Sequence, residues 1–189
     1  MCKTVYLTRK SFNRHAKYFV NALEDELRSR KIKVVSRSTN FVKAVVKKHR
    51  EYSIAIAIDF FNDHSKGGGL TLNKRCSEMS RVFSSILSDS VDRIMPRVYW
   101  RDFRFVSSDN NDWYKYFNNV SAETKVIFYL CTINNVNDLE IYRASFDKLI
   151  KTFADEIVRC LRSNNNYKTY IKSVKIAKLK LKRLKGRNL

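Results

Sequence analysis

The chain has 189 residues, of which 44% are apolar, with a single Pro and four Gly. This length suits one sizeable core, and the composition excludes a disordered chain or a flexible linker. Lys and Arg number 38 against 18 Asp and Glu, so the formal net charge is +20. A positive field of this size attracts nucleic acid, anionic lipid or an acidic partner, and a merely solvated basic surface is the alternative.

The sequence carries no sign of a membrane span or a signal peptide. No segment approaches the roughly 18 consecutive apolar residues of a spanning helix, and the start MCKTVYLTRK lacks an apolar core. We therefore expect a soluble protein located in the cytoplasm or in a virion. The four cysteines show no paired spacing, and Cys131 and Cys160 fall in apolar patterns, so reduced, buried thiols are expected.

Runs rich in β-branched residues alternate along the chain with stretches of helical periodicity. The expected strands are 4–7, 32–35, 53–58, 70–72, 103–106 and 126–132. The expected helices are 12–30, 41–49, 76–87 and 139–161, and 107–119 reads as a polar loop. The strands at 53–58 and 126–132 are nearly continuous in apolar residues, which is typical of parallel strands covered on both faces. Residues 1–162 are therefore predicted to form a three-layer α/β domain with a mostly parallel central sheet flanked by helices.

The tail at 163–189 differs from the rest of the chain. It holds nine Lys or Arg and no acidic residue, and it follows an Asn-rich break at 163–166. Its apolar residues space like heptad positions, which predicts a basic amphipathic helix. The candidate polyanion-binding residues are Lys168, Lys172, Lys175, Lys178, Lys180, Lys182, Arg183, Lys185 and Arg187. The helix could instead lie on a membrane surface, pack on a partner helix or on its own domain, or fray.

Three segments resemble a known enzyme family. KVIFYLCTINNVND at 125–138 looks like the family strand AVLVEVGFLSNPED that precedes its long C-terminal helix. IAIAIDFFNDHSKGGG at 54–69 is similar to a strand ending in SIHAN with its loop and following Gly, and LRSRKIKVVSR at 27–37 is similar to a helix leading to a "VVLTR" strand. In this order and spacing they resemble the zinc-dependent N-acetylmuramoyl-L-alanine amidases, over about residues 3–162.

The resemblance implies a fold without the family's chemistry. The family binds Zn²⁺ with a His after the first strand, a Glu at the start of the first helix and the His of SIHAN, and a further Glu acts as general base. Here 8–10 read Thr-Arg-Lys and 11–14 contain no carboxylate, while Asp59 falls on the SIHAN histidine and Tyr129 on the catalytic Glu. No catalytic residue and no cofactor are therefore expected.

Other candidate sites have less support in the sequence. His15, Asp59 and His64 could form a relocated zinc site, although His15 reads more simply as a solvated helix residue. His49 lies in a basic run and reads as surface. The glycines at 67–69 precede a strand rather than a helix, so they read as a turn rather than a phosphate-binding loop. No GxSxG, Walker or GxGxxG motif is present.

Three functional hypotheses follow. The first is a noncatalytic amidase-like structural or adaptor protein, a bacteriophage virion or tail component that contacts other subunits or nucleic acid through its basic surface. The phage setting is read from a composition rich in Lys, Asn, Ile and Tyr. The second is a divergent zinc amidase that hydrolyses peptidoglycan. The third is a nucleic-acid-binding module, for which the aromatic and basic stretch at 99–104 offers a stacking surface or merely an edge strand. A membrane surface is the least favoured partner.

Overall fold

The computed structural model describes residues 3–39, 52–62, 68–73, 77–96, 100–106, 120–163 and 166–185. The strands are β1 (Thr4–Lys10), β2 (Lys33–Thr39), β3 (Tyr52–Phe61), β4 (Gly68–Asn73), β5 (Trp100–Val106) and β6 (Ala122–Thr132). The helices are α1 (Arg14–Ser29), α2 (Glu78–Asp92), α4 (Val136–Arg162) and α5 (Tyr167–Lys185). The predicted helix at 41–49 and loop at 107–119 lie outside the described residues.

One six-stranded sheet organises these elements, with the order β2-β1-β3-β6-β4-β5. Strands β2, β1, β3 and β6 run parallel, β4 is antiparallel to β6, and β5 is parallel to β4. The centre of the sheet is formed by β3 and β6, and the run from Ile54 to Ile58 is fully buried. The predicted mostly parallel central sheet is confirmed, with one antiparallel pairing that the apolar pattern does not reveal.

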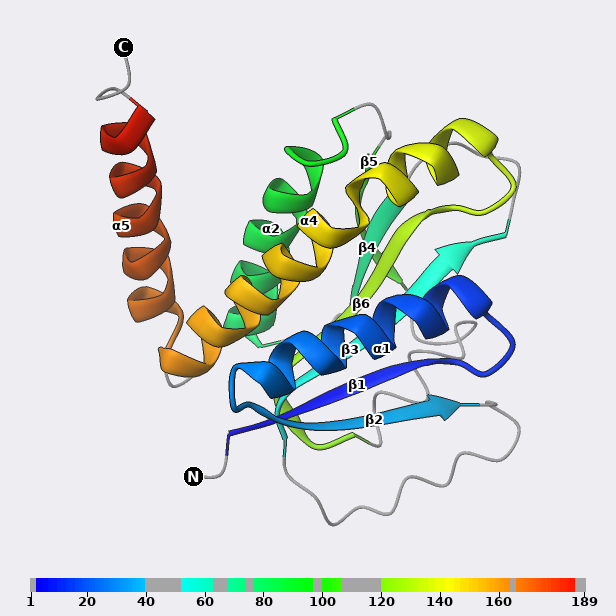
Figure 1. Cartoon of the computed structure of the whole chain (residues 1–189). Helices are drawn as coiled ribbons and strands as arrows, with labels where there is room; N and C mark the ends of the chain where they lie inside the picture. The colour runs from blue at the N-terminus through cyan, green and yellow to red at the C-terminus, as the bar shows by residue number, and fades with distance from the viewer. Residues whose placement is uncertain are drawn as a thin grey trace.

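Helices α1, α2 and α4 all cover the same face of the sheet (Figure 1). Their apolar stripes and alternate strand residues form the main core, in which Phe19, Phe83 and Phe153 are fully buried. The intervening strand residues point to the other face, where Tyr6 and Tyr52 stack within a second, smaller cluster. The α/β fold with helices packed on a central sheet is confirmed. Among the described residues, no helix packs on the second cluster.

Strands β1 and β3 are longer than the apolar pattern predicts. β1 reaches Lys10 rather than Leu7, and β3 reaches Phe61 rather than Ile58. The polar end of β1 is held by its ladder to β2, whereas the end of β3 is held both by its ladder to β6 and by the packing of Phe60 and Phe61. As a result Asp59 lies inside a strand, and both extensions lie at the carboxyl edge of the sheet.

The predicted tail helix is present as α5, and its first turns pack on the domain. Tyr170 is fully buried and Val174 nearly so. The ring of Tyr170 lies 6.1 Å from that of Phe83 on α2, and its hydroxyl donates a 2.7 Å hydrogen bond to Glu156 on α4. Among the described helices, none is both long and apolar enough to cross a membrane.

Candidate functional site

Four polar side chains lie where β1, β3 and β6 end and α1 begins. They are Lys10, Asn13, Asp59 and Tyr129. In open α/β sheets this carboxyl edge of the parallel strands is where ligands bind. Asp59 and Tyr129 face each other in the register of β3 and β6, so the two positions that the amidase resemblance selects are direct neighbours.

Asp59 is the centre of this group and has an exposed fraction of 1%. Its Oδ2 lies 3.0 Å from the Nζ of Lys10. Its Oδ1 accepts hydrogen bonds from the Nδ2 of Asn13, at 3.0 Å, and from its neighbour's backbone N–H, at 2.9 Å. Both carboxylate oxygens are therefore engaged inside the protein, as a buried charge requires.

Local structure explains why Lys10 and Asn13 reach Asp59. Alternation along the strands sends Lys10 and Asp59 to the same face of the sheet, that of the smaller cluster. A tight turn then joins β1 to α1, closed by a hydrogen bond from the N–H of Asn13 to the carbonyl of Lys10. Asn13 is the N-cap of α1, since its Oδ1 accepts from the N–H of Ala16 at 3.0 Å. One amide therefore caps the helix with its oxygen and binds Asp59 with its nitrogen.

Tyr129 lies beside this network and packs on an aromatic neighbour. Its ring stacks on Phe61, with ring centroids 4.4 Å apart and the planes inclined by 9°. On its other side, the backbone of Tyr129 pairs with Gly69 of β4. The glycines at 68 and 69 are therefore strand residues, and the predicted turn is wrong for these two positions.

The comparisons with known proteins agree with this architecture. No protein-family model matches the sequence, and no curated protein does. Solved structures do match. A protein of Neisseria meningitidis assigned as an N-acetylmuramoyl-L-alanine amidase superposes with a TM-score of 0.64 at 15% identity, covering 85% of this chain and 97% of that one. The N-acetylmuramoyl-L-alanine amidase of Clostridium difficile 630 gives 0.62 at 11% identity, covering 86% and 98%. The chain has the N-acetylmuramoyl-L-alanine amidase fold.

A third match supports the same fold. The amidase AmiC2 of Nostoc punctiforme gives a TM-score of 0.60 at 10% identity, covering 86% of this chain and 98% of that one. At these identities the likeness shows the fold alone, because one fold hosts active and inactive sites alike. The resemblance read from the sequence is confirmed at this level, and the chemistry has to be argued from the site.

The described residues at the carboxyl edge do not fit a zinc site. Protein zinc is held by Cys, His, Asp or Glu, with three protein ligands at a catalytic centre. Here the donors beside one another are a lysine ammonium, an asparagine amide and a single carboxylate. Across the described parts of the chain, no three His, Cys, Asp or Glu residues gather closely enough to hold a metal ion.

The relocated zinc set receives no support from the position of His15. Its ring lies 5.7 Å from that of Phe60, whose side chain belongs to the helix-covered core, whereas Asp59 points to the opposite face. Burial, and then the positive charge of Arg143, lower the pKa of His15. His15 therefore packs beside Phe60, on the side of the sheet opposite to the Asp59 carboxylate. His64, the third member of the set, lies outside the described residues.

The polyanion-binding candidates are only partly described. Lys168, Lys172 and Lys175 are exposed and share one side of α5, at helical spacings of four and three residues. Five further candidates lie in α5, with side chains outside the description: Lys178, Lys180, Lys182, Arg183 and Lys185. Arg187 lies outside the described residues, as do the side chains of edge strand β5, which holds most of the stretch at 99–104.

Sequence reasoning identified Asp59 and Tyr129 but missed the role of Asn13. The signal was present, because an Asn directly before an amphipathic run is a strong N-cap indicator. Lys10 was visible as a cation in place of a metal ligand, yet its pairing with Asp59 depends on strand register. That register became visible only in the fold.

Proposed function

We propose that this chain is a noncatalytic protein with the amidase fold, serving as a structural or adaptor subunit rather than as a hydrolase. The observation that carries the proposal is the ion pair between Lys10 and Asp59. Of the four positions to which the resemblance assigns the family's chemistry, Asp59 alone holds a group that could bind zinc. That carboxylate is already neutralised by the protein's own cation.

Electrostatics disfavour a divalent ion at Asp59 while the ion pair is in place. A divalent ion bound to Asp59 would lie about 4 Å from the Lys10 ammonium, a repulsion of about 8 kcal/mol at an effective dielectric constant of 20. Asn13 adds a neutral amide whose nitrogen, the atom facing Asp59, is a donor and not a ligand. The buried carboxylate is thus better explained as a structural partner of β1 and α1 than as part of a metal centre.

Metal content and hydrolysis test the proposal together. The full chain, purified with zinc present and then dialysed, is expected to hold well below one zinc per molecule and to leave peptidoglycan suspensions turbid. An active zinc amidase serves as the positive control for both assays. One zinc per chain together with clearing, both lost in Asp59→Ala, would overturn the proposal. That result would support the alternative of a divergent amidase, which is favoured by the fold match over 97% or more of two solved amidase chains.

The basic surface supplies the adaptor part of the proposal. The formal charge of +20 and the exposed stripe Lys168, Lys172 and Lys175 support contact with nucleic acid or with acidic subunits of an assembly such as a phage virion. If the stripe binds nucleic acid, replacing these three lysines by Gln lowers the affinity at low salt and flattens the dependence on salt concentration.

A matched control separates the stripe from net charge. Lys17, Lys148 and Lys151 are exposed on α1 and α4, so their triple Gln variant removes the same charge elsewhere. Equal losses in the two triple variants would show that charge alone acts, and the α5 stripe would be rejected as an interface. Point substitution is preferable to deletion of the tail, because deletion also removes buried Tyr170.

A further inference from the structure

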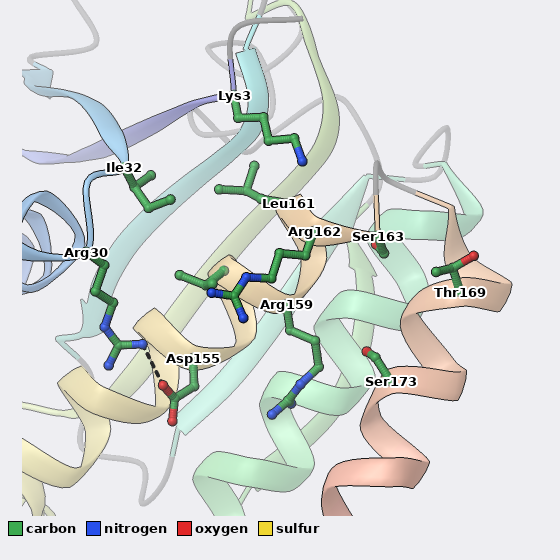
Figure 2. A pocket seen from close by; sticks show the side chains of 11 residues that line it. Lys3, Arg30, Ile32, Asp155, Arg159, Leu161, Arg162, Ser163, Thr169 and Ser173 are labelled. Carbon is green, nitrogen blue, oxygen red and sulfur yellow. Dashed lines mark hydrogen bonds and ion pairs between the residues drawn. The ribbon is translucent and has the colours of Figure 1, made fainter.

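A pocket of about 610 Å³ lies at the amino edge of the sheet, away from Asp59. It is enclosed by the residue before β1, the end of α1, the last turns of α4 and the first turns of α5 (Figure 2). Its volume falls within the roughly 300–1,000 Å³ of small-molecule sites. The charged residues that line it are Lys3, Arg30, Asp155, Arg159 and Arg162.

Two of the four cations in this lining are neutralised within the protein. Arg30 donates from Nη1 to Asp155 at 2.5 Å and from Nη2 to Glu26 at 2.6 Å. Burial acts to lower the pKa of Arg30, but the hydrogen bonds to Asp155 and Glu26 outweigh it and raise that pKa. Arg159 pairs with Glu156. These arginines are held in place and supply little net charge to the pocket.

The other two cations, Lys3 and Arg162, are exposed, and neither has a carboxylate partner among the described residues. They approach the pocket from different elements, Lys3 from the chain before β1 and Arg162 from the end of α4 (Figure 2). Thr169 adds a side-chain hydroxyl from α5. Two positive charges without a counter-ion in the described structure therefore line one concave site, from separate elements.

We propose that this pocket binds the phosphate group of a ligand, with the Arg162 guanidinium as its main contact and Lys3 as the second charge. A guanidinium offers two parallel N–H donors that match two phosphate oxygens, while an ammonium adds an undirected charge. The volume accommodates a ligand of mononucleotide size. This inference is independent of whether the carboxyl edge is catalytic, since it concerns different residues at the opposite edge.

Calorimetric titration of the full chain at low salt tests the site with four probes. Pyrophosphate and adenosine monophosphate are expected to bind, adenosine is expected not to bind, and a short single-stranded oligonucleotide tests nucleic acid as the source of the phosphate. Losing one charge-assisted contact in Arg162→Gln weakens phosphate binding about tenfold. Lys3→Gln weakens it by a smaller factor. Lys17→Gln removes an exposed lysine near the far end of α1 and leaves the affinity unchanged.

The outcomes distinguish a free phosphorylated ligand from a nucleic acid strand, and circular dichroism confirms that each variant folds. Weakening of pyrophosphate and monophosphate binding supports a free phosphorylated ligand, and weakening of oligonucleotide binding alone supports the phosphate of a nucleic acid strand. The proposal fails if no probe binds, if adenosine binds as well as its monophosphate, or if Arg162→Gln behaves like Lys17→Gln. None of these results depends on zinc or on hydrolysis, so failure here is distinguishable from failure of the proposed function.

Discussion

The Nζ of Lys10 lies 3.0 Å from the Oδ2 of Asp59, and the two side chains join the carboxyl ends of β1 and β3. Asp59 is 1% exposed, whereas Lys10 keeps 27% of its side-chain surface in solvent. In such a pair the Coulomb attraction mainly offsets desolvation, so the pair adds little net stability. Removing one partner is different, because the buried charge that remains has lost its compensation.

We expect Lys10→Met to lower the free energy of unfolding by about 2–3 kcal/mol, below the full cost of a buried pair because Lys10 is partly solvated. Asp59→Asn leaves the lysine free to turn toward solvent, so its cost is smaller. The double variant recovers part of the Lys10→Met loss. Urea unfolding measures all three, with Lys17→Met as the exposed control. A Lys10→Met protein as stable as the control would mean that the ion pair does not hold Asp59.

Asn13 has two separable tasks, and two substitutions distinguish them. Asn13→Ser keeps an N-cap acceptor for Ala16 but cannot donate to Asp59, so we expect a loss of about 1 kcal/mol. Asn13→Asp also caps well, yet it places a second carboxylate against Asp59. It should therefore be the more destabilising variant at pH 7, and the difference should shrink at low pH, where carboxylates are protonated. Urea unfolding at both pH values measures it, and equal stability of the two variants would contradict the contact with Asp59.

The centre of the fold was predictable from the sequence because its signal is apolar and local. Continuous Ile and Val runs identify β3 and β6, and regular three- and four-residue spacing identifies α1 and α4. The ends of β1 and β3 were not predictable, since Lys10 and Asp59 carry no apolar signal and are held by pairing with neighbouring strands. The antiparallel placement of β4 has the same origin, because pairing partners lie far apart in sequence.

The site was predictable in part for a related reason. The amidase resemblance pointed to Asp59 and Tyr129, which the structure places side by side. The partners of Asp59 could not be read from the sequence, because Asn13 lies 46 residues away and reaches it only through the β1–α1 turn. The pocket beside Arg162 depends equally on tertiary packing, as its walls come from four separate elements.

Tyr170 attaches α5 to the domain, and its hydroxyl and ring can be tested separately. Tyr170→Phe removes the hydrogen bond to the Glu156 carboxylate, so we expect a loss of about 1.5 kcal/mol, the low end for a charged acceptor because Glu156 keeps its arginine partner. Tyr18→Phe, on a tyrosine that is 67% exposed, is the matched control and should change stability by less than about 0.5 kcal/mol.

Removal of the whole Tyr170 ring should release the helix. In Tyr170→Ala we expect brief trypsin treatment to cleave within α5 at rates well above wild type, while the rest of the domain resists. Wild type and Tyr170→Phe should stay largely uncut in the first turns of α5. Equal cleavage of all three proteins would show that the contacts of Tyr170 with Phe83 and Glu156 do not anchor the helix.

The buried thiols Cys131 and Cys160 should make stability fall at alkaline pH. Burial raises the pKa of each thiol from 9.0 to about 12, helped by nearby carboxylates and, at Cys160, opposed by a hydrogen bond with Thr124. Because the folded value is the higher one, the stabilising contribution is complete below pH 9 and is lost as the pH rises toward 12. At pH 10 each thiol accounts for a loss on the order of 1 kcal/mol. Urea unfolding at pH 8 and 10 should show that the free energy of unfolding falls more between the two pH values in wild type than in the double variant Cys131→Ala/Cys160→Ala. Equal falls in the two proteins would mean that these thiols ionise as easily in the folded protein as in the unfolded chain.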